Sequence, residues 1–186
     1  MRTNALWTHL WNLKAPTSGL EDFRLDGRRA DGWVLAFDDA GQPYRLHYSL
    51  EFEKGWEPRT FSARVRDAHG SRTLALKRDN HLDWSDGEGN KLLELSGCLD
   101  LDLWPTPFTN SPSIWRLYLA LGECREIEAV FIEAPQLSIR RMRQAYTRLD
   151  QHHYLYQNLD GSGFEAVLTL GNDGLVERYP RFFQRQ

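Results

Sequence analysis

The stretch CLDLDLWPTPFTNSPSIWRLYLALG, from Cys98 to Gly122, decides the fold of this 186-residue chain. Leucines at positions 93, 95, 99, 101 and 103 alternate with small or polar residues, which is the period of two that a strand requires. Pro105 and Pro107 follow, and because proline has no N–H they prevent the strand from continuing. We therefore predict a strand that ends just before residue 105.

A short helix is expected after this break. Asn110 or Ser111 can cap its first turn, and Gly122 stands where a left-handed C-cap belongs. The residues before Gly122 are apolar on every side, and Arg116 is the only charge among them. A helix that is apolar all round is buried. The sequence thus predicts a short central helix, over about residues 111–121, with the rest of the chain wrapped round it.

Most of the remaining chain predicts strands. Short alternating or apolar runs are separated by turns rich in Asp, Asn and Gly, which is typical of a mainly β, mostly antiparallel sheet that is curved or closed. The expected strands cover residues 33–37, 44–52, 60–66, 73–77, 127–132, 161–170 and 175–179. No linker or repeat divides the chain, so we expect one domain over residues 1–186.

Two segments are ambiguous. Residues 138–149 have apolar positions near helical spacing, which slightly favours a helix, yet they also fit a strand. The first thirty residues are the least readable part, although Trp7, Leu10 and Trp11 fit one helical turn.

Composition excludes several classes of function. The net charge of −3 and the pI near 6.1 give no electrostatic argument for binding nucleic acid. No apolar run reaches the length of a membrane span, and residues 1–13 lack the features of a signal peptide. We expect a cytoplasmic protein without a membrane span.

Neither a metal site nor a cofactor site is expected. The six histidines lack ligand spacing, and no phosphate-binding or dinucleotide-binding motif is present. Cys98 and Cys124 lack CxxC spacing, and we interpret both as structural thiols.

Asp100 and Asp102 are the residues that could carry catalysis. They lie two positions apart on one strand face, where one carboxyl of a pair can have a raised pKa and act as an acid or base. The alternative is that they pair with Arg116, since a buried guanidinium needs carboxylates. We favour the pairing and a non-enzymatic protein, and the question of an enzyme stays open at this point.

Aromatic residues are the one excess in composition, at 12% of the chain with seven tryptophans. A curved sheet round a helix can leave an apolar cavity, and aromatic walls with a few polar groups suit an amphiphilic ligand. The residues expected to line or close such a cavity are Trp104, Phe108, Trp115 and Tyr118. The polar groups expected to face a head group are Asp100, Asp102, Asn110 and Arg116.

Several segments also match a known family. They are Gly19-Leu-Glu21, Cys98-Leu-Asp-Leu-Asp102, Thr106-Pro-Phe-Thr-Asn110, Ile114-Trp-Arg-Leu117, Gly122, Pro135-Gln-Leu137, Gln144-Ala-Tyr146, Tyr156, Gly163-Phe164, Asp173-Gly-Leu-Val176 and Tyr179-Pro180. Together they resemble the signature of the bacterial family named Putative glycolipid-binding. The segment 111–116 departs from the family's Leu-Pro-Ile-Arg-Arg-like run, because Trp115 replaces the first arginine.

The resemblance implies a spiral β-roll, in which a long antiparallel sheet wraps round a single helix and the protein forms a homodimer. It also implies that residues 138–149 are a strand. Members of the family are likened to periplasmic carriers of lipoproteins, which is the source of the glycolipid label, and the resemblance supplies no catalytic residues.

Three hypotheses follow. The first is a non-enzymatic protein that holds a glycolipid or another amphiphile between the sheet and the helix. A hydrolase that uses Asp100 or Asp102 is the second, and a structural module that forms a homodimer without a ligand is the third.

Overall fold

A computed structural model of the protein describes residues 2–10 and 19–186, and all the strands in this part belong to one sheet. Its fourteen strands lie in the order β7-β6-β5-β4-β3-β2-β1-β14-β13-β12-β11-β10-β9-β8. They are β1 (Arg2–His9), β2 (Gly19–Asp26), β3 (Arg29–Phe37), β4 (Pro43–Phe52), β5 (Pro58–Asp67), β6 (Gly70–Arg78), β7 (Trp84–Asp86), β8 (Asp100–Trp104), β9 (Cys124–Glu133), β10 (Ser138–Arg148), β11 (His153–Asn158), β12 (Glu165–Leu170), β13 (Val176–Tyr179) and β14 (Phe183–Arg185). Neighbouring strands are antiparallel except β8 and β9, which are parallel.

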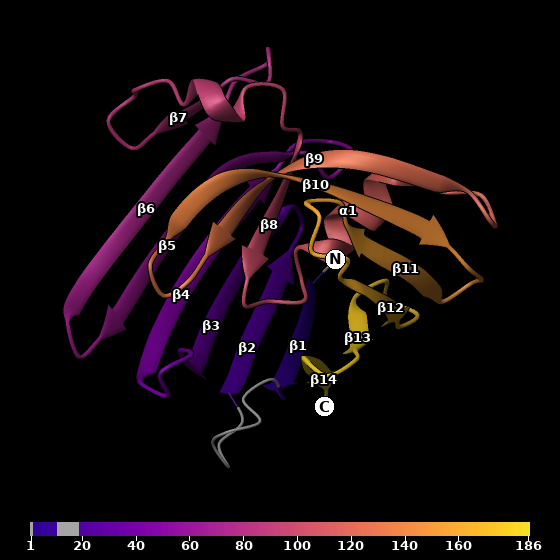
Figure 1. Ribbon diagram of the computed structural model, residues 1–186, viewed down its shortest axis with the longest axis horizontal. Helices are drawn as coiled ribbons and strands as arrows, with labels where there is room; N and C mark the ends of the chain where they lie inside the picture. The colour runs from indigo at the N-terminus through magenta and orange to yellow at the C-terminus, as the bar shows by residue number, and fades with distance from the viewer. Residues whose placement is uncertain (1, 11–18) are drawn as a thin grey trace.

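The sheet is rolled, so its two edge strands, β7 and β8, approach each other. The indole of Trp84 in β7 donates a hydrogen bond to the carbonyl of Cys98, just before β8, at 2.8 Å. A 3-10 helix, η1 (Leu93–Leu95), lies in the connection between these edges. Figure 1 shows β9 and β10 arching across the strands of the first half, with the single α-helix, α1 (Asn110–Leu117), under the arch. The predicted mainly β roll round one short helix is confirmed.

The roll has an inner and an outer face, because strand residues alternate between them. In β4 the side chains of Tyr44, Leu46, Tyr48 and Leu50 are buried on the inner face, whereas Arg45 points outward. The strands predicted by this alternation are present, and β12 starts later than expected, at residue 165. That residues 1–186 form one domain stays a prediction.

The helix is shorter than predicted. It spans Asn110–Leu117 and ends at Tyr118, which adopts a left-handed conformation with φ 46° and donates its N–H to the carbonyl of Ile114 at 3.2 Å. Gly122 is therefore not the C-cap. Two residues of the apolar run lie at the surface, since Tyr118 is 90% exposed and Leu121 is 72% exposed, whereas Leu119 is buried. The buried half of the helix is its polar N-terminal half.

The start of the central stretch also differs from expectation. Leu93 belongs to η1 and is exposed, so the strand begins only at Asp100. The residue before the helix is Thr109, and its side chain makes no capping bond because its hydroxyl is bound to Asp102. The predicted caps at Asn110 and Ser111 are wrong, since both residues lie inside the helix.

The described parts of the two ambiguous segments lie mainly in strands. Residues 138–148 form β10, as the family resemblance implied and against the slight preference for a helix. Trp7 lies in β1, with its indole bound to the carbonyl of Val176 at 2.7 Å, so the predicted helical turn is wrong there. Trp11 lies outside the described residues. Strands β1, β2, β7, β11 and β14 were not expected from the sequence.

Candidate functional site

The predicted ion pair between the helix and β8 is present. Two nitrogens of the Arg116 guanidinium group bind one carboxylate: Nε donates to Oδ1 of Asp100 at 3.1 Å, and Nη2 donates to Oδ2 at 2.5 Å. Ser113 donates to the same carboxylate at 3.0 Å. The Asp100 side chain is 3% exposed, and burial raises its pKa although Arg116 opposes that shift. The pair fastens the last turns of the helix to the sheet edge.

Asp102 makes the second contact between β8 and the helix region. Its two carboxylate oxygens accept hydrogen bonds from the hydroxyl of Thr109 at 3.0 Å and from Nε2 of Gln144 at 2.6 Å. Burial raises the pKa of Asp102, and the two hydrogen bonds oppose this. Each carboxylate of the predicted pair is thus occupied by its own partners, and neither is held as an open acid or base.

Two further hydrogen bonds hold the first turn of the helix. Tyr146 donates to Oδ1 of Asn110 at 2.9 Å, and the Ser111 hydroxyl accepts the N–H of Val176 at 3.2 Å. These bonds explain why polar residues can occupy the buried half of a helix, because a buried polar group without a partner is costly. We use the name helix seat for this set of buried or half-buried polar residues: Asp100, Asp102, Thr109, Asn110, Ser111, Ser113, Arg116, Gln144 and Tyr146.

Trp115 closes one side of the helix seat. Its indole N–H donates to the carbonyl of Gly174 at 2.9 Å, and its ring lies 4.5 Å from that of Trp56, centroid to centroid. Gly174 has φ +77°, and a Cβ there would lie 2.5 Å from the indole nitrogen, so only glycine fits this position. Trp115 therefore connects the helix to the turn before β13.

The other predicted aromatic residues do not share one cavity wall. Phe108 is fully buried and packs on Phe23 of β2, with ring centroids 4.3 Å apart. Trp104 is half-buried against Phe182, at 5.2 Å, and borders a polar hollow of about 240 Å³ near residues 133–136. Tyr118 points to solvent. The structure thus joins Asp100, Asp102, Asn110, Arg116 and Trp115 through the helix seat, and it places Trp104 and Tyr118 elsewhere.

A second buried polar cluster was missed by sequence reasoning. The Glu21 side chain is completely buried, and its Oε1 accepts bonds from the hydroxyls of Tyr48 at 2.5 Å and Thr106 at 2.8 Å. His9 lies on its other side, 3.7 Å away. The sequence of β2 contains a signal for this cluster. Glu21 lies two residues before Phe23, so both side chains are on the inner face of the strand. The cluster ties β2 and β4 to the turn before the helix.

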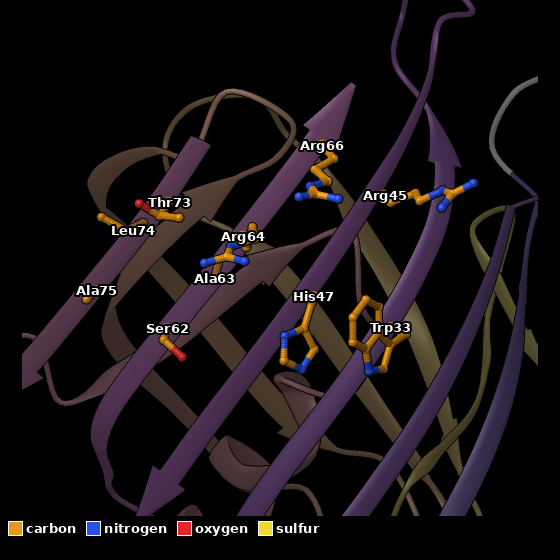
Figure 2. Close-up of a pocket in the computed structure, with 10 residues that line it drawn as sticks. All are labelled: Trp33, Arg45, His47, Ser62, Ala63, Arg64, Arg66, Thr73, Leu74 and Ala75. Carbon is orange, nitrogen blue, oxygen red and sulfur yellow. The ribbon is translucent and has the colours of Figure 1, made fainter. Parts of the chain in front are cut away.

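The outer face of the sheet carries a hollow that the sequence did not reveal. A cavity of about 580 Å³ lies across β3, β4, β5 and β6, in the size range of ligand pockets. Figure 2 shows its lining, in which Trp33 and His47 lie side by side on neighbouring strands. Their rings are stacked, 4.2 Å apart and 19° from parallel, and Nε2 of His47 is 3.1 Å from Oδ2 of Asp31. Trp33 is 56% exposed, so the other side of its indole is open.

Strand register brings three arginines together in this hollow. Arg45 and Arg66 are direct cross-strand partners. Arg64 is the cross-strand partner of His47, two residues further along on the same outer face. Directly opposed side chains on one face have Cβ atoms about 4.5–5.5 Å apart. Within residues 2–10 and 19–186, none of the three guanidinium groups has a hydrogen bond or an ion pair. Each of these three cations is therefore unpaired in that part of the chain.

An apolar groove continues from the hollow. It has a volume of about 800 Å³ and shares Arg45 and Arg66 with the first cavity. Its remaining lining is mostly apolar: Leu20, Leu35, Ala36, Phe37, Pro43, Tyr44 and Ala68, with Gln42 and Asp67. Leu20 and Leu35 are cross-strand partners and are 40% and 53% exposed. We call the two joined cavities the outer groove.

Other kinds of site find less support. Among the described residues no group of histidines, cysteines and carboxylates is arranged to hold a metal ion. In the same part of the chain, no helix has the length and apolar character needed to cross a membrane. Cys98 is buried and Cys124 exposed, both as free thiols, and burial raises the pKa of Cys98 to about 11.

Comparison with known proteins gives the family. A family model with the description Putative glycolipid-binding matches residues 8–185. The chain belongs to this family. A crystal structure of a DUF1089 family protein from Pseudomonas aeruginosa has 46% sequence identity and a TM-score of 0.89, and the match covers 94% of this chain and 96% of that chain. No curated protein matches.

Membership in the Putative glycolipid-binding family can be set beside the geometry. The segments that resemble the family signature supply most of the helix seat, including Asp100, Asp102, Asn110 and Arg116. Glu21 and Thr106 also come from such segments and bind each other in the second cluster. The arginines of the outer groove fall in none of these segments.

Proposed function

We propose that the protein binds an amphiphile of the glycolipid class without catalysing a reaction, and that the ligand lies in the outer groove. The observation that carries this proposal is the junction of two cavities of different character. One has a stacked Trp33–His47 pair and polar groups, and the other has Leu20 and Leu35 on its wall. A sugar head group suits the first cavity and an alkyl tail suits the second.

The sizes of the two cavities agree with this division. An alkyl chain in the apolar groove would contribute about 0.8 kcal/mol for each CH₂ that it buries. The exposed face of Trp33 offers a flat apolar surface to the CH groups of a sugar ring, while the polar rim can bind its hydroxyls. The family's description supports the same class of ligand.

The sequence predicts a ligand between the sheet and the helix, and this placement of the ligand stays a prediction. Contacts in that region favour the outer groove instead. Phe108 packs on Phe23, Trp115 packs on Trp56, and the carboxylate of Asp100 is bound to the helix. Those side chains make contacts within the protein, whereas the outer groove is open. The partners of Asp100 and Asp102 also argue against the hydrolase alternative.

A spectroscopic experiment can test the placement. The probes are decyl glucoside and decyl glucuronide, both below their critical micelle concentrations, and versions of them with a brominated tail, which quenches tryptophan fluorescence on contact. We expect quenching and a higher melting temperature with at least one probe, because a ligand that binds only the folded state stabilises it. The variant Trp33→Phe should lose most of the quenching.

Trp115→Phe is the matched control, because it replaces a tryptophan of the region between sheet and helix. Loss of quenching in Trp115→Phe, with quenching retained in Trp33→Phe, would instead place the ligand under the sheet. Absence of binding by either sugar amphiphile would contradict the proposed function. The homodimer, the cytoplasmic location and the bacterial source stay predictions. Light scattering of the purified chain measures the first of them.

A further inference from the structure

The three free arginines are the feature of the outer groove that a neutral sugar does not explain. The chain has a net charge of −3, yet this face holds Arg45, Arg64 and Arg66 without carboxylate partners among the described residues. Two acidic residues at this face have other partners. Asp31 contacts His47, and Asp67 accepts a hydrogen bond from Arg72. The surface is thus locally cationic on a protein that is acidic as a whole.

Strand register makes the arrangement unfavourable in the absence of an anion. Arg45 and Arg66 stand directly opposite each other on β4 and β5, and like charges in this position destabilise a sheet. Guanidinium groups bind carboxylate, phosphate or sulfate through paired N–H donors. An anion placed between the two side chains would replace their repulsion by charge-assisted hydrogen bonds.

The positions of Arg45 and Arg66 indicate which part of the ligand bears the negative charge. Arg45 and Arg66 line both the polar cavity and the apolar groove, so they lie at the junction of head group and tail. Arg64 extends the positive charge toward the Trp33–His47 stack, which is the wall offered to the sugar. The negative charge therefore belongs to the head group, on the side near the alkyl chain.

A second copy of the chain fits this face less well. In a twofold interface the same patch meets itself, so the three arginines would face their own counterparts. An anionic ligand meets the patch with complementary charge instead.

We propose that the outer groove selects amphiphiles whose sugar head group carries a negative charge, and that Arg45, Arg64 and Arg66 bind this anion while Trp33 holds the sugar. This inference rests on the proposed function, since it names the class of ligand for the same site. It adds a specificity that a merely apolar groove would not have.

The experiment is calorimetric titration with the matched pair decyl glucuronide and decyl glucoside, which differ in a carboxylate against a hydroxymethyl group. We expect the glucuronide to bind about tenfold more tightly at low ionic strength, which corresponds to about 1.4 kcal/mol. Added sodium chloride should reduce this ratio, because salt screens an exposed charge pair. The single variants Arg45→Thr and Arg66→Thr should bring the ratio of the glucuronide affinity to the glucoside affinity close to one.

Arg143→Thr is the control, because Arg143 is similarly exposed but lies on β10 and is paired with Glu126 at 2.6 Å. It should keep the tenfold preference. Melting temperatures of all variants establish that each is folded before its affinity is compared.

Four outcomes would overturn the inference. One is equal affinity for the two probes in the wild type, which would leave the proposed function intact. Another is a preference for the glucuronide that survives both arginine substitutions. Cosedimentation with phosphatidylglycerol vesicles without binding of monomeric glucuronide would assign the face to a membrane surface. A dimer that dissociates on Arg66→Thr would assign it to a second copy.

Discussion

Arg116 in the helix seat and Arg66 in the outer groove are the same residue type in opposite surroundings. The Arg116 side chain is 18% exposed, and it makes two hydrogen bonds to a carboxylate that is 3% exposed. Arg66 lies on the outer face of β5 with Arg45 as its cross-strand partner, and no residue of the described chain neutralises it. One charge is satisfied by the fold, whereas the other is left for something outside the chain.

The contrast separates two reasons for a charged residue to be present. A buried ion pair holds two elements in register. Removing one member strongly destabilises the fold, because the other member is left as an unpaired buried charge. An exposed and unpaired charge adds little to the stability of the fold, and it remains available to a ligand of opposite charge. The segments that resemble the family signature contain residues of the first kind, such as Asp100 and Arg116, which seat the helix. They do not mark where the proposed ligand lies.

The largest effect should follow Arg116→Ala. Removing the guanidinium leaves the buried carboxylate of Asp100 with Ser113 as its remaining side-chain partner, and we expect unfolding free energy to fall by about 3 kcal/mol. Urea unfolding followed by circular dichroism measures the change. The control Arg143→Ala removes an ion pair in which both side chains are more than half exposed, and should lower stability by less than about 1 kcal/mol. Equal effects of the two substitutions would show that burial does not distinguish them.

A smaller effect, which depends on pH, is expected for Asp102→Asn. Burial raises the pKa of Asp102 above its ordinary value of 3.8, so the folded state retains a proton that the unfolded state has already released. The wild type therefore loses stability relative to the variant as the pH rises from below 3.8, until it passes the folded-state pKa. Below pH 3.8 the difference is constant, since the carboxyl is protonated in both states.

Unfolding free energies of both proteins between pH 3 and pH 8 check this sign. In the reverse trend, the stability of the wild type relative to the variant would increase as the pH rises. That result would mean that the hydrogen bonds from Thr109 and Gln144 stabilise the carboxylate by more than burial destabilises it.

The smallest effect on stability should follow Arg66→Thr. The substitution removes a cross-strand like-charge pair with Arg45 and introduces a residue with high strand propensity, so unfolding free energy should rise by about 0.5 kcal/mol or less. The same variant is expected to lose its preference for an anionic head group. A destabilisation comparable with that of Arg116→Ala would show that Arg66 has a structural role, and the comparison between the two regions would fail.

The contact between Asp100 and Arg116 could be predicted from sequence because all of its components are local. A strand with two carboxylates on one face precedes a buried helix with one cation, and few other partners are available. The length of the helix could not be predicted in the same way. Its apolar end is diverted by tertiary bonds, in which Arg148 of β10 donates to the carbonyl of Leu119 and the N–H of Gly122 binds the carbonyl of Arg148. Such partners override local propensity.

The first two strands were missed because apolar residues lie on both of their faces. Leu6 and Leu20 point outward, while Trp7 and the buried Glu21 point inward, so no clean alternation of apolar and polar residues remains. The outer groove was missed for another reason. Arg45 and Arg66 are far apart in the sequence, and only the register between β4 and β5 makes them neighbours.

The pairing of β1 with β14 has a consequence for how the protein is made. Trp7 is paired with Arg185, so β1, which is translated before all the other strands described, acquires its second neighbour only after β14 has been translated. Until then β1 is the open edge of a partial sheet that contains β1–β6, and open edges tend to pair with other chains. The two halves of the roll join where β1 pairs with β14, so the sheet is completed only after β14 has been translated.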